Sequence, residues 1–396
     1  MKKKYASLIL FCAVSISFAQ ISVSTITTTF KGSGGVTIDN DGNVYIADFG
    51  DSLGGPDTDG IPNNVMKLDT DLNLTVFAND FTGASGNEFD SNGVLFQADV
   101  RDNAIYKIVD GSRVFVTSVG MVTPIGIAFD SADNLYVCNC GNSTIRKITP
   151  GGISTLFSTG GGFLACPNGM TIDENDNLYV VNFSNPFIVK IEPDGTVTNL
   201  GNTGAGNGHI DYDQNTKNLY VASFSGNFLY YLNIDSMNSG VFAGTGTAGN
   251  DDGAALSATF SAPNGIAVSK TGDSIYVNSS ATLNNSNLNP QYVRLLTNVL
   301  GSLSVEEFET PNNRVKTYPN PALDMLTIES NLITDLSNIS VEILDIKGGL
   351  IKTLINFDSK EQFKLEIDIS KLQSGVYFYS IIRQNRSIYR GRFIKK

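Results

Sequence analysis

Six polar side chains recur at matched positions along the chain and offer the chemistry of a polar binding site. Each lies three residues beyond an aromatic residue: Asp48, Asp99, Asn139, Asn182, Ser223 and Ser279. Carboxylate, amide and hydroxyl groups that converge can hydrogen-bond a polar ligand, and their oxygens suit a hard cation such as Ca²⁺. In the alternative interpretation, each side chain caps its own strand and satisfies nearby backbone groups. The elements that carry these residues decide whether they meet.

These residues belong to a repeated unit of about forty residues. In each copy an apolar run ends at an anchor residue, and the aromatic residue follows six or seven positions later. The anchors are Asp39, Asp90, Asp130, Asp173, Asp213 and Ser269. The runs are strand-length, rich in β-branched and aromatic residues, and bounded by Gly, Asn and Asp, as β-strands are. Six copies predict an all-β, six-bladed β-propeller; a β-sandwich with coincidental turns is the alternative.

The predicted propeller places the first strand of each copy nearest the central axis. The loops that lead into these strands then open on the same face as the six polar residues above. These loops contribute Gly34, Asn87, Pro124, Asn168, Asn207 and Asn264. We therefore expect a polar funnel on this face. Its ligand-binding residues would be Asp48, Asp99, Asn139, Asn182, Asn168, Asn207 and Asn264.

Glu88 and His209 lie at the starts of predicted inner strands and should point toward the central channel. They are the candidate catalytic residues. His209 is the sole histidine of the chain, so mechanisms that need several imidazoles, as metal ligands or as an acid–base pair, are excluded. His209 is then either a single general base or a buried, hydrogen-bonded structural residue.

The predicted ring also needs a closing strand. The last repeat offers three strands, Gly265 to Ser269, Ser274 to Ser279 and Tyr292 to Thr297, and no fourth. The β-rich segment Ser22 to Phe30 precedes the first repeat. We expect this segment to supply the missing outer strand, because such a closure covers edges that would otherwise stay unpaired.

Residues 1–19 have the pattern of a secretory signal peptide. Lys2, Lys3 and Lys4 precede an apolar stretch that ends in Ser17-Phe18-Ala19, with small residues at the positions a signal peptidase reads. No other apolar run approaches membrane-spanning length, so no transmembrane segment is expected. The sequence thus predicts an exported protein.

Charge is distributed unevenly along the chain. The net charge is −12, with 30 acidic and 11 basic residues between Tyr5 and Pro311, and 9 acidic and 13 basic residues from Asn312 to Lys396; Lys2, Lys3 and Lys4 supply the remaining three positive charges. An acidic propeller repels nucleic acid and anionic lipid. Nucleic acid is therefore not an expected partner.

Three cysteines remain after removal of the predicted signal peptide: Cys138, Cys140 and Cys166. Cys138 and Cys140 share one face of a strand and are poor partners for each other. Cys140 and Cys166 would both lie on the funnel face, in neighbouring blades. A Cys140–Cys166 disulfide is one expectation for an exported protein, with free thiols as the alternative.

The best-formed repeat, Val241 to Ser280, resembles the NHL-repeat pattern, with Pro-x-Gly-Ile-Ala-Val followed by a Tyr-Val pair. Asn142 to Gly152, NSTIRKITPGG, is similar to the third strand of that family. The likeness covers roughly Ser22 to Asn298 and implies a six-bladed propeller over residues 20–300. NHL propellers include both enzymes and binding platforms, so the resemblance implies no single function.

Two further segments resemble the gluconolactonase family. Asn168-Gly169 and Asn264-Gly265 look like the metal-coordinating Asn-Gly of its inner strands, and Ser85 to Asp99 looks like its second-strand pattern. The resemblance implies a divalent cation such as Ca²⁺ as cofactor. Its ligands would be Glu88, Asn168, Asn207 and Asp99. The family's Glu-Gly-Pro is absent from the first inner strand, which reads GGVTID.

A polar linker at residues 301–314 leads to a C-terminal segment, 315–396. Alternating runs broken by Gly-Gly and Ser-Gly predict a small Ig-like antiparallel β-sandwich there. Its signals are TYPNPALDMLTIE, VEILDIKGGLIKTL, LEIDISKLQSGVYFYSI and GRFIKK. In this order they resemble the type A C-terminal sorting domain of the type IX (Por) secretion system of Bacteroidetes. The resemblance implies that this machinery is a partner and that the protein is secreted or displayed at the cell surface; a carbohydrate-binding or adhesive module is the alternative.

The leading functional hypothesis is an exported propeller that binds a small molecule, a glycan or a protein. A metal-dependent gluconolactonase-like hydrolase is the alternative.

Overall fold

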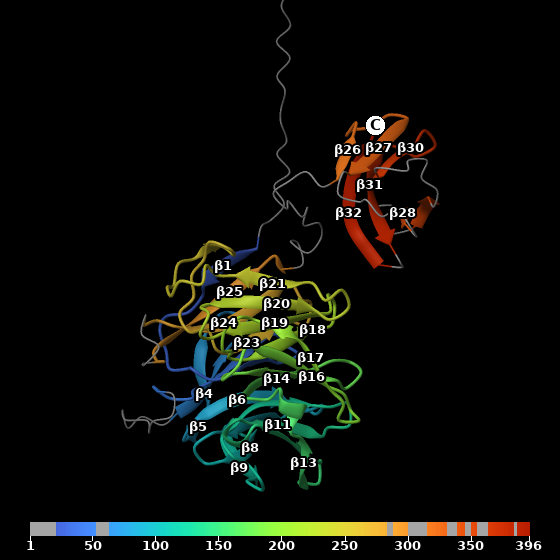
Figure 1. The fold of residues 1–396 in the computed structure, drawn as a ribbon. Coiled ribbons are helices and arrows are strands. Elements are labelled where there is room, and N and C mark those ends of the chain that lie inside the picture. The colour runs from blue at the N-terminus through green and yellow to red at the C-terminus, as the bar shows by residue number, and fades with distance from the viewer. Residues whose placement is uncertain are drawn as a thin grey trace, which may run out of the picture. The chain divides into compact units, whose positions relative to one another are not determined.

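The computed structural model describes residues 21–52, 63–282, 288–299, 315–330, 339–344, 350–354, 363–383 and 386–396. The chain divides into two compact units, Met1–Ser304 and Val305–Lys396 (Figure 1). The predicted signal peptide and linker lie outside the described residues, so their boundaries stay predictions.

Six antiparallel sheets make up the first unit. Blade one contains β2 (Val36–Ile38), β3 (Val44–Ala47), β4 (Asn63–Leu68) and β5 (Leu74–Phe81). Blade two contains β6 (Ala84–Phe89), β7 (Leu95–Asp99), β8 (Ala104–Val109) and β9 (Ser112–Thr117). Blade three contains β10 (Pro124–Phe129), β11 (Leu135–Asn139), β12 (Thr144–Ile148) and β13 (Ser154–Ser158). The short 3₁₀ helices η1 (Cys140–Asn142) and η2 (Gly160–Gly162) flank its outer strands.

The remaining blades follow the same order. Blade four contains β14 (Pro167–Ile172), β15 (Leu178–Asn182), β16 (Phe187–Ile191) and β17 (Val197–Asn202). Blade five contains β18 (Ile210–Asp213), β19 (Asn218–Ser223), β20 (Phe228–Asn233) and β21 (Ser239–Ala243). Blade six contains β23 (Ile266–Val268), β24 (Ser274–Ser280), β25 (Gln291–Thr297), β1 (Ser22–Thr25) and β22 (Gly253–Ala254), in that spatial order.

The first strands of the blades form a closed ring around one axis. Strands β2, β6, β10, β14, β18 and β23 each contact the next, and β23 contacts β2. The unit is therefore a six-bladed propeller with the first strand of each blade innermost. Its core is a series of hydrophobic clusters between blades, such as the one that joins Tyr136 and Cys138 of blade three to Val180 and Val189 of blade four.

The hairpin turn between the first and second strands has one construction in several blades. The anchors Asp39, Asp130 and Asp173 accept hydrogen bonds from the hydroxyls of Tyr45, Tyr136 and Tyr179, at 3.0, 3.2 and 2.9 Å. The same carboxylates accept backbone N–H groups of the turn. One residue of each turn has a positive φ: Gly42, Gly93, Asp133, Asp176, Lys217 and Gly272. We call the end of the propeller that carries these hairpins the turn face, and the opposite end the loop face.

The N-terminal strand closes the ring, as predicted. β1 pairs with the outer strand of blade six, β25, with Val23 opposite Leu296. Only Ser22–Thr25 of the predicted segment forms this strand; Phe30 adds an isolated bridge to Gln291. Asp252 fastens the closure, because its carboxylate accepts the backbone N–H of Thr25 at 3.0 Å and Nη2 of the buried Arg294 at 2.9 Å.

The second unit has two sheets that share a single hydrophobic core. One contains β26 (Lys316–Tyr318), β27 (Met325–Ser330) and β30 (Phe363–Asp368). The other contains β28 (Ile339–Leu344), β29 (Leu350–Leu354), β31 (Gly375–Arg383) and β32 (Arg386–Lys395). Alternating residues of β27 and β28, such as Leu326, Ile328, Val341 and Ile343, point into that core. The described part of the chain has no helix long and apolar enough to cross a membrane.

Candidate functional site

Five glycines and one histidine occupy the same position of the six inner strands, four residues before the anchor. They are Gly35, Gly86, Gly126, Gly169, His209 and Gly265. A Cβ on Gly126 would lie 2.4 Å from the carbonyl oxygen of Asn168 on the next blade. A glycine is needed there because the neighbouring backbone leaves no room for a side chain. The imidazole of His209, from blade five, reaches past blade six toward Gly35 of blade one.

A second ring lies two residues nearer the anchors. In blade order it reads Thr37, Glu88, Ala128, Thr171, Asp211 and Ala267. The order threonine, acid, alanine occurs twice around the ring. Glu88 and Asp211 are therefore three blades apart and lie on opposite blades. Thr37 Oγ1 donates to Glu88 at 3.3 Å and Thr171 Oγ1 donates to Asp211 at 3.2 Å.

These two rings enclose a small polar cavity on the axis, which we call the axial well. Glu88, Asp211, Thr37, His209, Asn87 and apolar residues line about 30 Å³, room for one or two water molecules. The side chains of Glu88 and Asp211 are partly exposed, whereas His209 is 7 % exposed. Since the two acids lie nearer the hairpins, the well opens toward the turn face and His209 closes its floor.

Burial shifts the pKa of all three titratable groups of the axial well toward the neutral form. It raises the pKa of Glu88 to about 7; the charge of Asp211 also raises this pKa, whereas the hydrogen bond from Phe89 N–H lowers it. It raises the pKa of Asp211 to about 6, although the N–H groups of Val268 and Tyr212 each donate to this carboxylate at 2.8 Å. It lowers the pKa of His209 to about 4, so the imidazole is neutral at neutral pH.

Two side chains of the well keep unused hydrogen-bonding capacity. His209 Nε2 has no hydrogen-bond partner among the described residues, and neither do the amide nitrogen and oxygen of Asn87. Both residues are more than nine-tenths buried, at 7 % and 6 % exposed. Unpaired buried polar atoms are destabilising, so a bound group that pairs with them would be stabilised.

A larger groove lies beside the well on the turn face. It has a volume of about 320 Å³ and is lined by Ile172, Tyr212 and Val268, which directly follow the second-ring residues on β14, β18 and β23, and by polar residues that include Glu174 and Asn215. Tyr212 donates its hydroxyl to Glu174 at 2.9 Å. We call this the turn-face groove.

The strand-end residues predicted to bind a ligand are used inside the protein. Asp48, Asp99, Asn139 and Asn182 are fully buried at 0 % exposed. Asp99 accepts Thr82 N–H at 2.8 Å, and Asn182 accepts Ala165 N–H at 3.0 Å. Each bond ties the end of the second strand to the loop that leads into the same blade. The capping interpretation accounts for Asp99 and Asn182 without a ligand, whereas the buried Oδ2 of Asp48 has no hydrogen-bond partner among the described residues. The role of these side chains in binding stays a prediction.

The predicted leading-loop amides link neighbouring blades. Asn168 Nδ2 donates to the carbonyl oxygens of Asn207 and Gly208, at 3.0 Å each. Asn264 Nδ2 donates to Ser33 O at 2.6 Å, which joins blade six to blade one. Asn87 was grouped with these loops, but it lies inside β6 and lines the axial well. The grouping was wrong for Asn87, because β6 already begins at Ala84 and Asn87 is its fourth residue.

The loop face also carries an apolar cluster. Phe224, Ala262 and Leu288 are buried, and Phe49 and Phe183 pack against them. The rings of Phe183 and Phe224 have centroids 5.5 Å apart.

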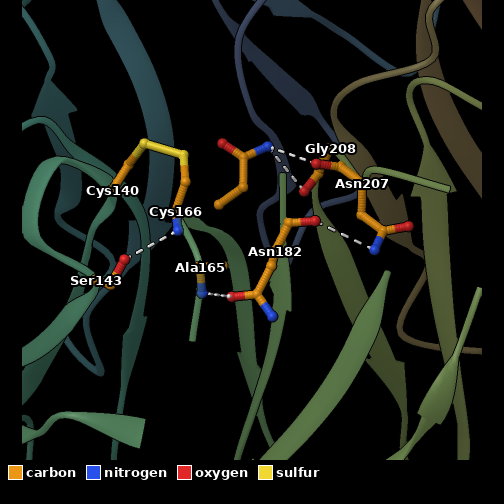
Figure 2. Close-up of a disulfide and its surroundings, with 8 residues drawn as sticks. Cys140, Ser143, Ala165, Cys166, Asn182, Asn207 and Gly208 are labelled. Atoms are coloured by element: carbon orange, nitrogen blue, oxygen red, sulfur yellow. Dashed lines mark hydrogen bonds between the residues drawn. A yellow bond between two sulfur atoms is a disulfide. The ribbon is translucent and has the colours of Figure 1, made fainter. Parts of the chain in front are cut away.

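The loop face also holds the disulfide that was one of the two expectations for the cysteines. Cys140, after β11, is bonded to Cys166, before β14, across a sequence separation of 26. Figure 2 shows this disulfide with Ser143, whose hydroxyl accepts Cys166 N–H at 3.2 Å, and with Asn182 and Asn207 nearby. Cys138 is a buried free thiol whose pKa burial raises. The disulfide thus links blades three and four.

The four predicted metal ligands fall in three separate hydrogen-bond networks. Glu88 bonds with Thr37 in the well, Asp99 bonds with Thr82, and Asn168 bonds with the backbone at Asn207. Among the described residues, no three histidine, cysteine, aspartate or glutamate side chains are grouped so that they could hold a metal ion. The metal site with asparagine ligands stays a prediction.

Sequence reasoning did not single out Asp211 and Thr37, which line the axial well with Glu88, or Thr171, whose hydroxyl donates to Asp211. A signal was present: all four lie two residues before an anchor. Aligning the copies on the anchors would have matched Asp211 with Glu88.

Comparison with known proteins gives different results for the two units. Residues 316–396 match the protein family described as "Secretion system C-terminal sorting domain". The chain carries a sorting domain of this family. The sorting domain indicates export through the type IX system to the cell surface or beyond. None of the curated protein sequences matches the chain significantly.

Solved structures resemble the propeller that precedes the sorting domain. A protein of unknown function from Bacteroides thetaiotaomicron is 16% identical, with 70% of this chain and 76% of that chain covered and a TM-score of 0.56. An auxiliary nutrient binding protein from the same species is 14% identical, with 70% and 76% covered and a TM-score of 0.54. A gluconolactonase from Xanthomonas campestris is 12% identical, with 73% and 93% covered and a TM-score of 0.54. At these identities the likeness shows the fold alone.

Proposed function

We propose that this protein is an exported binding module whose propeller takes a small polar ligand into the axial well and the adjoining turn-face groove. The sorting domain would deliver it through the type IX system, after a signal peptide at residues 1–19 directs it out of the cytoplasm. In this proposal the second unit is an Ig-like sandwich that acts only in export.

The supporting observation is the unsatisfied chemistry of the well. Glu88 and Asp211 form no ion pair with a described residue, and His209 Nε2 and the Asn87 amide have no partner there. Polar groups that converge in a pocket open to solvent are the usual basis of a small-ligand site. One protein of similar fold is described as a nutrient binding protein. This is compatible with a binding role here but is not the basis of the proposal.

The binding proposal is tested by thermal denaturation of the purified protein with a panel of amines, amino acids, sugars and oligosaccharides. A ligand that binds the folded state raises the midpoint by mass action. Asp211→Asn should abolish any such stabilisation, and Asp71→Asn, an exposed acid on the outer hairpin of blade one, should leave it unchanged. Stabilisation that survives Asp211→Asn would place the ligand elsewhere, and no response to the whole panel would count against a binding role.

Export is tested separately. Residues 315–396 fused to a reporter should send it to the cell surface or the medium of a host with the type IX system. A reporter that stays in the periplasm would count against the role of this domain.

The hydrolase alternative has less support, because its predicted metal ligands take part in separate hydrogen-bond networks. A metal-dependent hydrolase would retain a divalent cation such as Ca²⁺ through dialysis and would act on lactones. Metal analysis with a lactone panel therefore distinguishes it from the binding module.

A further inference from the structure

The axial well is an anionic site without a counter-charge. Glu88 and Asp211 are its two acids, and no lysine or arginine is among the residues that line it. Each carboxylate accepts hydrogen bonds only from a threonine hydroxyl and backbone N–H groups. Two like charges in a confined space repel each other. A cation between them would relieve this repulsion, and the strongly acidic propeller would attract one.

The floor of the well adds an acceptor that has no partner. His209 is neutral, and its Nε2 has no partner among the described residues. Neutral imidazole nitrogen can accept a hydrogen bond. The hydroxyl of Thr37, which already donates to Glu88, can accept as well. Apart from the amide nitrogen of Asn87, which can donate, the well therefore presents acceptors from its walls and its floor, and these suit a group that donates hydrogen bonds.

The size and composition of the well select among cations. About 30 Å³ admits a group the size of a water molecule or two, which excludes a quaternary ammonium. Coordination of a divalent metal is not favoured either, since the described residues hold no group of three acidic, histidine or cysteine side chains suited to a metal. A primary ammonium is small, carries three donors and has no acceptor.

Resting on the proposed function, we propose that the axial well binds the primary ammonium group of an unbranched aliphatic amine. Glu88 and Asp211 flank its charge from opposite blades, and Nε2 of His209 accepts one of its hydrogen bonds at the floor. The alkyl chain leaves the well through its mouth at the turn face, where Ile172, Tyr212 and Val268 begin the turn-face groove.

The single histidine makes the well directly observable. The ¹H and ¹³C signals of the imidazole in the full-length protein arise from one residue, at the floor of the proposed site. Titration with n-butylamine at pH 8 should shift these signals in a saturable manner and raise the thermal midpoint. Tetramethylammonium and n-butanol should do neither, because one is too large and donates no hydrogen bond, and the other carries no charge.

Variants assign the effect to the two acids. Glu88→Gln and Asp211→Asn should each weaken butylamine binding at least tenfold, whereas Asp71→Asn should leave it unchanged. If one variant fails to fold, the other and the imidazole titration of the unmodified protein still decide the matter. Binding of Ca²⁺ instead of the amine, or an equal response to tetramethylammonium, would overturn the proposal. Stabilisation by neutral sugars without any response to amines would overturn it and leave the binding module standing; no response to either would overturn both.

Discussion

His209 of blade five reaches past blade six to Gly35 of blade one: its Cε1 atom lies 3.2 Å from the position that a Cβ on Gly35 would take. The histidine thus fills space that a side chain at Gly35 would occupy. This one contact explains why the axial well has a floor. It also shows how closely the inner strands are packed around the axis.

Gly126→Ala should lower the free energy of unfolding of the propeller by about 2–4 kcal/mol. The new Cβ would lie 2.4 Å from the carbonyl oxygen of Asn168 and 2.9 Å from the amide nitrogen of Met170. Both are backbone atoms, so a whole inner strand must move. Thermal and urea denaturation measure the change.

Gly151→Ala is the matched control. Gly151 is exposed and its nearest heavy atom, Thr149 Oγ1, would lie 3.8 Å from an added Cβ. We expect a change within about 0.5 kcal/mol. Equal effects of the two substitutions would refute the close approach of the inner strands.

The fold was predictable because hydrogen bonds within each hairpin turn fix the spacing of the repeat. The spacing from anchor to aromatic residue recurs since Asp173, for example, accepts the hydroxyl of Tyr179 and two N–H groups of the turn between them. Any copy that keeps this turn must keep the spacing. The closing strand was predictable too, because blade six visibly lacked an outer strand.

Replacing Val23 with Asp should disrupt ring closure. Val23 is 2 % exposed, lies in the hydrophobic cluster of blade six and pairs with Leu296. A buried, unpaired carboxylate is strongly unfavourable, so β1 should detach and the unfolding transition should become less cooperative. Ser24→Asp, one residue along on the partly exposed side of the same strand, should have a small effect. A fully cooperative transition in Val23→Asp would contradict closure by β1.

Loss of the Cys140–Cys166 disulfide should lower stability by about 3 kcal/mol, the entropic contribution expected for a closed loop of this length. The loop spans 26 residues and links blades three and four. The expected result is a lower thermal midpoint in the Cys140→Ser, Cys166→Ser double variant. Dithiothreitol should lower the midpoint of the unmodified protein by the same amount and leave the double variant unchanged. An effect of dithiothreitol on the double variant would point to another thiol.

The site was less predictable than the fold, for two physical reasons. Polar residues at strand ends look alike in sequence whether they bind a ligand or cap a loop, and Asn182 does the latter with Ala165 N–H and Phe163 O. The axial well depends instead on register. Asp211 and Glu88 line the same well only because blades two and five lie opposite, which the closed ring decides and a single strand does not show.

Glu88→Gln should stabilise the protein more at pH 8 than at pH 5. Burial raises the pKa of Glu88 from 4.5 to about 7. Between these values the folded state holds a proton that the unfolded state has released, so the contribution of Glu88 to stability falls as pH rises through this range. Glutamine does not ionise, so the Glu88→Gln variant does not lose this stability as pH rises. Allowing for the partial exposure of the side chain, the difference between the two pH values should be on the order of 1–2 kcal/mol.

Thermal midpoints of both proteins at pH 5 and pH 8, without added amine, measure this difference. The groups facing Glu88 are Thr37, which does not titrate in this range, and the charge of Asp211 on the opposite blade, whose pKa of about 6 lies inside it. Removing the charge of Glu88 also relieves Asp211 at pH 8, so both effects have the same sign. His209, with a pKa of about 4, stays neutral in both folded proteins throughout. Saturating butylamine should make the unmodified protein more stable than Glu88→Gln at pH 8, because the ionised acids then have a cation to neutralise. A midpoint difference between the two proteins that changes with neither pH nor amine would mean that Glu88 does not ionise in the well.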